Sequence, residues 1–364
     1  MSILLFSILA LIAGLGILIY QFLKKQVELG FAATFMATGL SLVVSSFGTF
    51  SERVISALLN AENSVNTMQF ITGVVLIFVG IWMSLYVTNK LTILNLLGVK
   101  ERRIEEHRSD VKLNQFEFKE REVDLSIYPK KEMNKERFQD AKESIELALH
   151  SFHAETKNVK KGYTGTAPIP LTAYAGYCYK GAPTTEFFEY NISLNKFEKL
   201  KKSREWVLNN HWPKLNRIQL HSELIEQSQD VVIGISTSYK IQDHHVKQFK
   251  APFVHLTTDK PQPNSIKYEA QLKAYVEEIQ NLLFELGQRE NIKRIHLVMS
   301  SQSCLAFELG KKFTTNTYMK QLTVYHFKTN QEPVYPWGIT FNNEGVFFVD
   351  CKNVEVGEYD QTYV

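Results

Sequence analysis

The stretch IHLVMSSQSCLAFELGKKF, residues 295–313, decides the fold of this chain. Its first five residues predict a buried strand, and the apolar residues after the turn predict a helix. The turn between them carries Ser300, Ser301, Gln302 and Ser303. A strand, a hydroxyl-rich turn and a helix in this order are typical of α/β folds, in which a helix N-terminus presents free N–H groups to anions.

The same pattern occurs a second time, at an offset of 134 residues. With no gap, Gly176 falls on Gly310, and PIPLTAYAGY falls on QSCLAFELGK. The offset also aligns KERFQDAKESIELALHSFH with EAQLKAYVEEIQNLLFELG, and FEYNISL with LTVYHFK. Because three segments agree in one register, we predict two related Rossmann-like halves at residues 122–215 and 216–350, related by a pseudo-twofold axis.

Candidate ligand-binding residues follow from this repeat, because ligands of open α/β sheets bind beyond the carboxyl ends of the strands. Two such turns facing each other would form a composite pocket suited to a ligand with several phosphates. Helix capping is the alternative role for the serines, a solvated loop for the residues outside the two turns, and packing for the tryptophan. The candidates are Ser300, Ser301, Gln302, Ser303, Thr164, Gly165, Thr166, Pro168, Thr237, Ser238, Tyr239, Lys130 and Trp337.

Catalysis and metal binding are not expected from the same residues. Cys304 would need a base, but no Cys-His-Asn/Asp constellation can be specified from spacing, and the repeat aligns it with Pro170. No GxSxG motif surrounds Ser301. His150 and His153 have no further ligands nearby in sequence, so they predict no metal site. We therefore expect a binding protein with no catalytic residue and no cofactor.

The N-terminal quarter predicts membrane helices. Three uncharged stretches, at 3–22, 31–50 and 68–87, are each long enough to span a hydrocarbon core. The middle one is rich in Ala, Thr and Ser, and an interfacial segment is its alternative. Basic residues flank the stretches so that three spans place the N-terminus outside and the long C-terminal part in the cytosol. Residues 90–121 are then a juxtamembrane linker, and 351–364 form a C-terminal tail.

Cysteine content agrees with a cytosolic compartment, whereas the net charge does not discriminate between partners. The net charge of +3 argues neither for nor against a polyanionic partner. The three cysteines show no CxxC spacing and no even pairing, which favours reduced thiols over disulfides or zinc.

The run GYTGTAPIPLTAYAGY, together with IKRIHLVMSSQSCLAFELGKKF, resembles the SAVED family over about residues 120–350. The resemblance implies two fused CARF-like halves that sense cyclic oligonucleotides in bacterial CBASS anti-phage defence. Members of the family often carry a proline in the second-half turn, where this sequence has Gln302. That departure bears on the details of ligand contact.

With membrane spans in the effector position, the chain looks like a transmembrane SAVED effector of the bacterial inner membrane, with the SAVED domain in the cytoplasm. The resemblance implies an adenine-containing cyclic tri- or tetranucleotide as ligand, made by a partner cyclic-oligonucleotide synthase, and no direct DNA binding. Ligand binding would drive homo-oligomerisation and damage the lipid bilayer, leading to abortive infection. The alternatives are a membrane-tethered CARF-like enzyme that cleaves a cyclic oligonucleotide, and a cyclic-oligoadenylate sensor of a type III CRISPR system.

Overall fold

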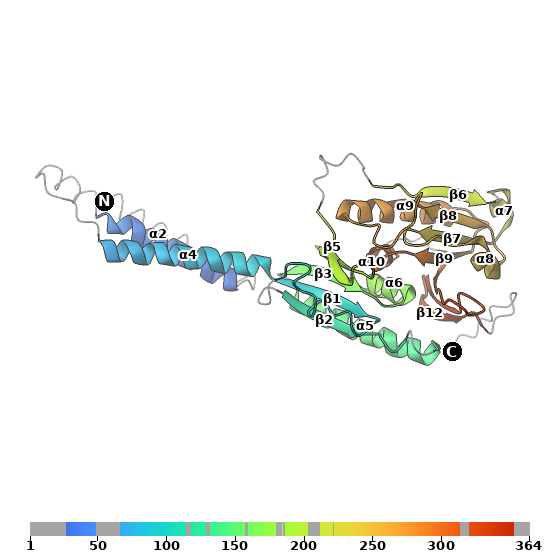
Figure 1. Ribbon diagram of the computed structural model, residues 1–364, viewed down its shortest axis with the longest axis horizontal. Coiled ribbons are helices and arrows are strands. Elements are labelled where there is room, and N and C mark those ends of the chain that lie inside the picture. The colour runs from blue at the N-terminus through green and yellow to red at the C-terminus, as the bar shows by residue number, and fades with distance from the viewer. Residues whose placement is uncertain are drawn as a thin grey trace, which may run out of the picture. The chain divides into compact units, whose positions relative to one another are not determined.

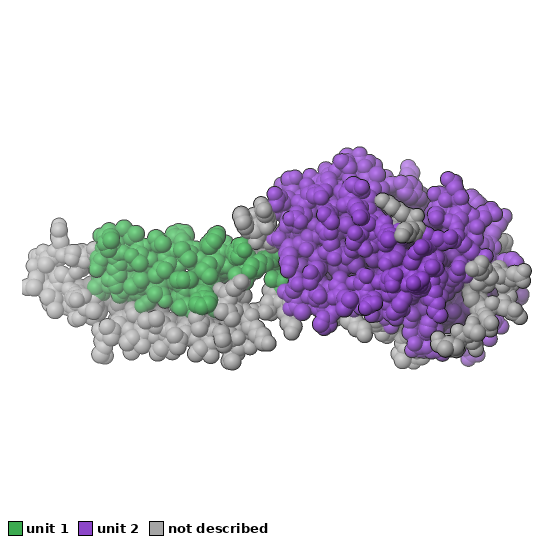
Figure 2. Space-filling model, turned by 90° about the horizontal axis from the view of Figure 1, so that it is seen from below, with its two compact units in different colours: residues 1–91, 158–160 green, residues 92–157, 161–364 purple. Residues whose placement is uncertain are grey.

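Two compact units make up the chain, one of residues 1–91 with 158–160 and one of the remaining residues (Figure 2). The computed structural model describes residues 27–48, 66–113, 118–128, 132–156, 159–179, 184, 186–202, 212–220, 222–313 and 320–352.

The first unit contains two apolar helices, α2 (Val27–Ser46) and α4 (Thr67–Asn89), which pack side by side (Figure 1). Glycines lie where their backbones meet. A Cβ atom at Gly39 would be 2.5 Å from the carbonyl oxygen of Gly73, and a Cβ atom at Gly73 would be 2.7 Å from that of Gly39. Residues without a side chain allow helices to approach this closely, as in helix pairs that associate within a bilayer.

One helix of the described residues, Thr67–Val87, is long and apolar enough to cross a membrane. It coincides with the span expected at 68–87. The span expected at 31–50 overlaps α2, whose apolar part, Gly30–Ser46, is shorter. The span expected at 3–22 lies outside the described residues, so the number of spans stays a prediction.

The second unit contains two sheets, and the first of them has the strand order β2-β1-β3-β4-β5. Its strands and helices are β1 (Leu91–Leu97), β2 (Phe118–Asp124), α5 (Lys135–Glu155), β3 (Lys160–Gly165), α6 (Ile169–Cys178), β4 (Glu186–Asn191) and β5 (Lys196–Lys199). The structure does not show residues 90–121 as the expected juxtamembrane linker. Residues 91–97 form a fully buried strand, and residues 101–113 form turns.

The second sheet has the order β12-β11-β10-β9-β7-β8-β6. Strands β10, β9, β7 and β8 run parallel, and β6, β11 and β12 add antiparallel edges. Its elements are β6 (Asn216–Leu220), α7 (Ser222–Gln227), β7 (Asp230–Ser236), α8 (Asp243–Val246), η1 (Lys247–Phe249), β8 (Phe253–Thr257), α9 (Glu269–Gly287), β9 (Arg294–Ser300), α10 (Ser303–Lys312), β10 (Gln321–His326), β11 (Trp337–Asn342) and β12 (Gly345–Asp350).

The predicted repeat relates the two sheets. Helices α5 and α9, strands β3 and β9, and helices α6 and α10 each begin 134 residues apart. The order β2-β1-β3-β4-β5 corresponds to β8-β7-β9-β10-β11. The first half therefore begins at β1, and not at residue 122. Helices α6 and α10 pack against each other between the halves, and one hydrophobic core runs through both.

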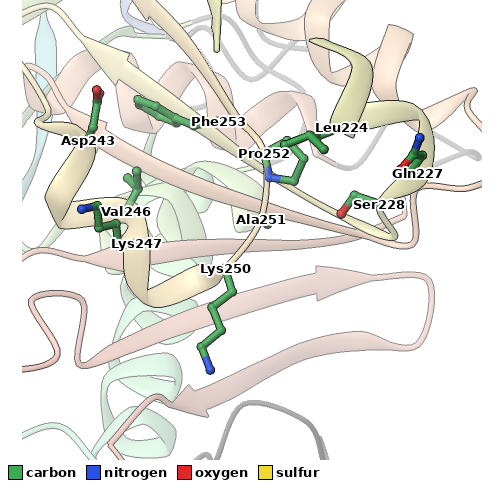
Figure 3. Close-up of a pocket in the computed structure, with 10 residues that line it drawn as sticks. All are labelled: Leu224, Gln227, Ser228, Asp243, Val246, Lys247, Lys250, Ala251, Pro252 and Phe253. Atoms are coloured by element: carbon green, nitrogen blue, oxygen red, sulfur yellow. The ribbon is translucent and has the colours of Figure 1, made fainter. Parts of the chain in front are cut away.

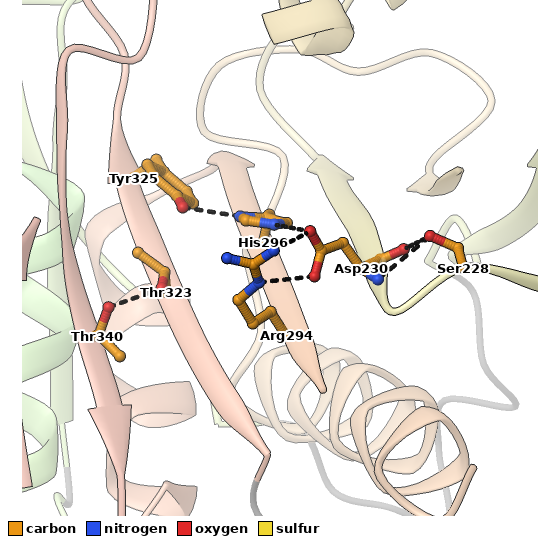
Figure 4. Close-up of polar contacts among 7 residues, drawn as sticks. All are labelled: Ser228, Asp230, Arg294, His296, Thr323, Tyr325 and Thr340. Carbon is orange, nitrogen blue, oxygen red and sulfur yellow. Dashed lines mark hydrogen bonds and ion pairs between the residues drawn. The ribbon is translucent and has the colours of Figure 1, made fainter. Parts of the chain in front are cut away.

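A network of polar side chains joins strands β7, β9 and β10 of the second sheet, and it begins at the amino-terminal ends of β7 and β9 (Figure 4). Arg294 donates two hydrogen bonds of 2.7 Å to Asp230 on the neighbouring strand. The Nε2 atom of His296 lies 3.9 Å from the same carboxylate, and its Nδ1 atom is 2.7 Å from the hydroxyl of Tyr325. The imidazole is therefore engaged by groups of its own sheet. Its partners are Asp230 and Tyr325. Cys304, which would need a base to act as a nucleophile, is not one of them.

Candidate ligand-binding site

The structure brings the carboxyl ends of β7 and β9 together, so the candidate residues that follow these two strands are neighbours. The carbonyl oxygen of Ser300 accepts hydrogen bonds from the N–H groups of Thr237 and Ser238, at 3.0 and 2.9 Å. The Oγ atom of Ser300 accepts a third, from the N–H of Tyr239 at 3.1 Å. These contacts hold the turn in shape. The Tyr239 ring is 66% exposed, so it is free to meet a ligand.

Gln302 is the N-cap residue of α10, and its side chain binds a loop of the same half without capping the helix. Its Oε1 atom accepts the N–H of Ile266 at 2.6 Å, and its Nε2 atom donates to the Ile266 carbonyl at 3.1 Å. The side chain is only 7% exposed. Gln302 therefore positions the loop that follows β8, and its amide group is already satisfied.

Ser303 joins the two halves. Its Oγ atom lies 2.6 Å from the hydroxyl of Tyr163 on β3, whose ring stacks on Phe307 of α10 at 3.9 Å between centroids. A Cβ atom at Gly165 would lie 2.9 Å from the Ser303 Oγ atom, so this position has no room for a side chain. Ser303 and Gly165 therefore belong to the interface between the halves.

An internal carboxylate occupies the N-terminus of α10. The Oε1 atom of Glu189, on β4 of the first half, accepts the N–H of Cys304 at 2.6 Å. Burial raises the pKa of this carboxyl to about 7, although hydrogen bonds from Cys304 and Ser303 oppose the shift. The helix N-terminus favours a negative charge, and Glu189 supplies it. The expected phosphate cradle at this helix is corrected accordingly: the site holds a protein carboxylate. Sequence reasoning missed Glu189, because nothing near residue 189 marks it.

The turn of the first half, residues 164–168, binds the end of β1 and does not form an anion-binding site. The Oγ1 atom of Thr166 accepts the N–H groups of Gly98 and Val99, at 2.9 and 3.1 Å. Thr164 is 1% exposed within β3. Pro168 and Pro170 have no N–H to offer at the start of α6, so this turn does not form the predicted second half of an anion site.

A polar cavity of about 380 Å³ lies beside the N-terminus of α10 and is shared by both halves. Of the predicted residues it contains Gln302. Ser301 and Thr237 lie at the strand ends nearby, and their hydroxyl oxygens are buried without a hydrogen-bond partner among the described residues. The cavity is lined by Glu189, Asn191, Leu194, Glu198, Lys199, Leu200, Lys201, Gln262, Pro263, Asn264, Ile266, Lys267 and Gln302.

The position that corresponds to the polar cavity under the repeat is almost filled by side chains. Tyr128 and Glu132, which fall on Gln262 and Ile266 at the offset of 134, line a cavity of only about 20 Å³. An ion pair between Lys352 and Glu132 lies across it. Trp337, 6% exposed, also lines it and packs against His326 and Phe348. Trp337 therefore has a packing role, and Lys130 lies outside the described residues.

A second cavity, of about 710 Å³ and thus larger than the polar one, lies elsewhere in the second unit (Figure 3). It is lined by the segment from α7 to the start of β7 and by the segment from α8 to the start of β8. Leu224, Val246 and Phe253 give it an apolar wall, and Lys247 and Lys250 lie at its side. It is at the amino ends of the parallel strands. Ligands of open α/β sheets bind at the carboxyl ends, so we assign the site to the smaller polar cavity.

Residues 145–341 match the sequence model of the SMODS-associated and fused to various effectors sensor domain, SAVED. The chain belongs to the SAVED family. The matched range includes all predicted site residues except Lys130, and the SAVED resemblance of the sequence is confirmed. Within the described residues, this SAVED protein shows no group of three or more His, Cys, Asp or Glu residues that could hold a metal ion.

Among solved structures, the chain is similar to the Cap4 SAVED/CARF-domain containing receptor of Acinetobacter baumannii with the cyclic trinucleotide 3′3′3′-cAAA. The identity is 11% and the TM-score 0.45, over 85% of this chain and 65% of that one. The Moraxella osloensis Cap4 receptor matches at 10% identity and a TM-score of 0.42, over 83% and 59% of the two chains. This SAVED protein thus spans less than two thirds of either receptor. No curated protein matches it.

Proposed function

We propose that this SAVED protein is a membrane-anchored sensor of a cyclic oligonucleotide in CBASS-type anti-phage defence. One observation carries the proposal: the polar cavity at the carboxyl ends of the strands is built by both halves, as a receptor for a multivalent ligand requires. Membership of a sensor family supports the same function. The cyclic trinucleotides 3′3′3′-cAAA and 2′3′3′-cAAA, present in Acinetobacter baumannii Cap4 structures, are the first ligands to test.

Two lysines at the mouth of the cavity favour an anionic ligand. The N–H of Lys201 donates to the carbonyl of Lys267 at 2.8 Å, so the two residues lie on adjacent backbone segments. Both are exposed and line the cavity. Two neighbouring like charges repel each other, and a bound phosphate relieves that repulsion while it gains two charge-assisted contacts.

The proposed mechanism of signalling is ligand-driven assembly at the membrane. Helix α4 is long and apolar enough to span a membrane over Thr67–Val87, and its outward side chains include Met68, Phe78 and Trp82, which are 66–77% exposed. Such a surface is stable in lipid. A ligand that shifts chains from separate to assembled must favour the assembled state by roughly 5.5 kcal/mol to invert a 1:99 ratio. Assembly of the helices then disrupts the inner membrane.

A purely receptor role is favoured over catalysis. Cys304 is fully buried, and burial raises the pKa of its thiol well above the ordinary value, so a thiolate is disfavoured. His296 is held by groups of its own sheet. Cleavage of the ligand, the alternative function, is therefore an outcome to be tested rather than expected.

The deciding experiment measures binding and assembly of the full chain in detergent. Calorimetry with cyclic di-, tri- and tetra-adenylate should give saturable heat for one ring size, and mass photometry should show larger particles with that ligand. The double variant Lys201→Glu, Lys267→Glu should weaken binding at least about tenfold. Lys273→Glu, at an exposed position of α9 outside the cavity, is the matched control. No binding of any of the three ligands overturns the receptor function, and cleaved ligand after incubation establishes the enzyme.

A further inference from the structure

The cavity has a buried floor and a charged rim. Its buried lining residues are Glu189, Leu200, Ile266 and Gln302, none more than 7% exposed, and its basic residues are exposed at the mouth. Leu200 and Ile266 offer apolar surface to the faces of an aromatic ring. An ionised carboxyl group in the floor repels phosphates and the lysines at the rim attract them, so the cavity favours a nucleotide with a base inward and its phosphates at the rim.

The side-chain amides of two lining residues, Gln302 and Asn191, are already engaged. Both amide atoms of Gln302 bind the backbone of Ile266. The amide of Asn191 donates to Glu198 at 3.0 Å and accepts the N–H of Leu194 at 3.2 Å. These side chains have little left with which to distinguish one base from another.

Glu189 is different, because a carboxylate has about four acceptor positions. Cys304 and Ser303 at the start of α10 use at most three of them. These donors also fix the carboxyl group in place, since Glu189 lies on β4 and its partners on a helix of the other half. A fixed, buried acceptor with remaining capacity is the kind of group that discriminates between ligands by one hydrogen bond.

We propose that Glu189 reads a base of the bound cyclic oligonucleotide by accepting a hydrogen bond from an exocyclic amine, the 6-amino group of adenine or the 4-amino group of cytosine. This inference rests on the proposed receptor function. When Glu189 is ionised, a keto oxygen at the same position of the base would face the carboxylate lone pairs and donate no hydrogen bond to it. Burial raises the pKa of Glu189 to about 7, and an amine donor from the ligand favours the ionised form.

The test uses two probes that differ at this position of each base, cyclic tri-adenylate and cyclic tri-inosinate, in which a keto oxygen replaces the amine. Calorimetry on the full wild-type chain in detergent should show cyclic tri-adenylate binding about 10- to 100-fold more tightly, the range for one hydrogen bond to a charged group. Glu189→Gln should reduce that ratio to within about threefold, because an amide can both donate and accept.

The control is Glu122→Gln, which neutralises another carboxyl whose pKa is raised by burial, on β2 and outside the cavity. It should keep the wild-type ratio. Equal affinity of the wild-type protein for both probes overturns the role of Glu189, and this result does not depend on whether any variant folds. A folded Glu189→Gln protein that keeps the wild-type ratio overturns it as well. Binding of neither probe, nor of any other cyclic oligonucleotide, would count against the receptor function itself.

Discussion

Gly176 and Gly310 make the same contact in opposite directions. A Cβ atom at Gly176 would lie under 3.0 Å from the carbonyl oxygen of Phe307, and a Cβ atom at Gly310 would lie equally close to that of Ala173. Phe307 follows Ala173 by the same 134 residues that separate the two glycines. The contact between α6 and α10 is therefore its own image under the pseudo-twofold axis.

Alanine at either glycine should destabilise the protein, because the added methyl group meets a backbone carbonyl that cannot turn aside. We expect Gly176→Ala and Gly310→Ala each to lower the free energy of unfolding by about 1–3 kcal/mol, measured by urea unfolding in detergent. Since the two sites share one interface, the double variant should lose less than the sum. Ser144→Ala, on the exposed side of α5, should change stability by less than about 0.5 kcal/mol. Strict additivity would contradict a shared contact.

Glu189 should make the fold less stable as pH rises. Its carboxyl has a pKa of about 7 in the folded state against 4.5 as the ordinary value. Its contribution is complete below pH 4.5 and is lost as pH rises through about 7, because the folded state then has to ionise a buried group. From pH 5 to pH 8, the wild-type protein should lose about 2 kcal/mol more than Glu189→Gln. Parallel pH profiles of the two proteins would show that the carboxyl is not buried as described.

Asp230 should make the fold less stable as pH falls, which is opposite to the effect of Glu189. Burial alone would raise the pKa of this carboxyl, but the nearby His296 imidazole and the two hydrogen bonds from Arg294 hold it at about 2. A lowered folded-state pKa gives stability above the ordinary value of 3.8, and that stability is lost as pH falls through about 2. Asp230→Asn should cost about 2 kcal/mol at pH 7 and nearly nothing at pH 1.5, by urea unfolding. An equal cost at both pH values would indicate lost packing instead of a lost ion pair.

Gln302 should control the mobility of the loop after β8. Gln302→Ala removes both hydrogen bonds to Ile266, and the Ile266 amide should exchange its hydrogen at least about tenfold faster, measured by mass spectrometry. Gln248 makes the same two-bond clamp on Tyr335, at 3.1 Å for each bond, and provides a matched control. Gln248→Ala should leave exchange at Ile266 unchanged. Unchanged exchange in Gln302→Ala would mean that packing alone holds the loop.

The sequence could reveal the repeat, because helical periodicity and the paired turns leave a pattern at one offset. It also located the strand ends at residues 236–239 and 300–303, although only Gln302 of these residues lines the cavity. It missed β1, since a buried seven-residue apolar run next to an apolar helix and a charged segment has no alternation to mark it as a strand.

The sequence predicted the position of the site better than the hydrogen bonding of its side chains. Whether Ser300 or Thr166 is available to a ligand depends on which backbone N–H groups reach its hydroxyl, and those groups lie about 60–70 residues away in sequence. Glu189 gains its role from a helix 115 residues downstream. A local pattern predicts where polar groups gather, and only the fold decides which of them are already satisfied.

The filled counterpart of the cavity has a consequence for how the protein responds to a signal. A duplicated domain begins with two equal sites, and a chain that kept both could sharpen its own dose-response curve through coupling between them. Here the Lys352–Glu132 pair and Trp337 occupy the second place. Of these two repeat-related places, only one is open in the described part of the chain. If that place is the ligand site, we expect a single chain to give a simple saturation curve, and a threshold in the response would then have to be generated between chains.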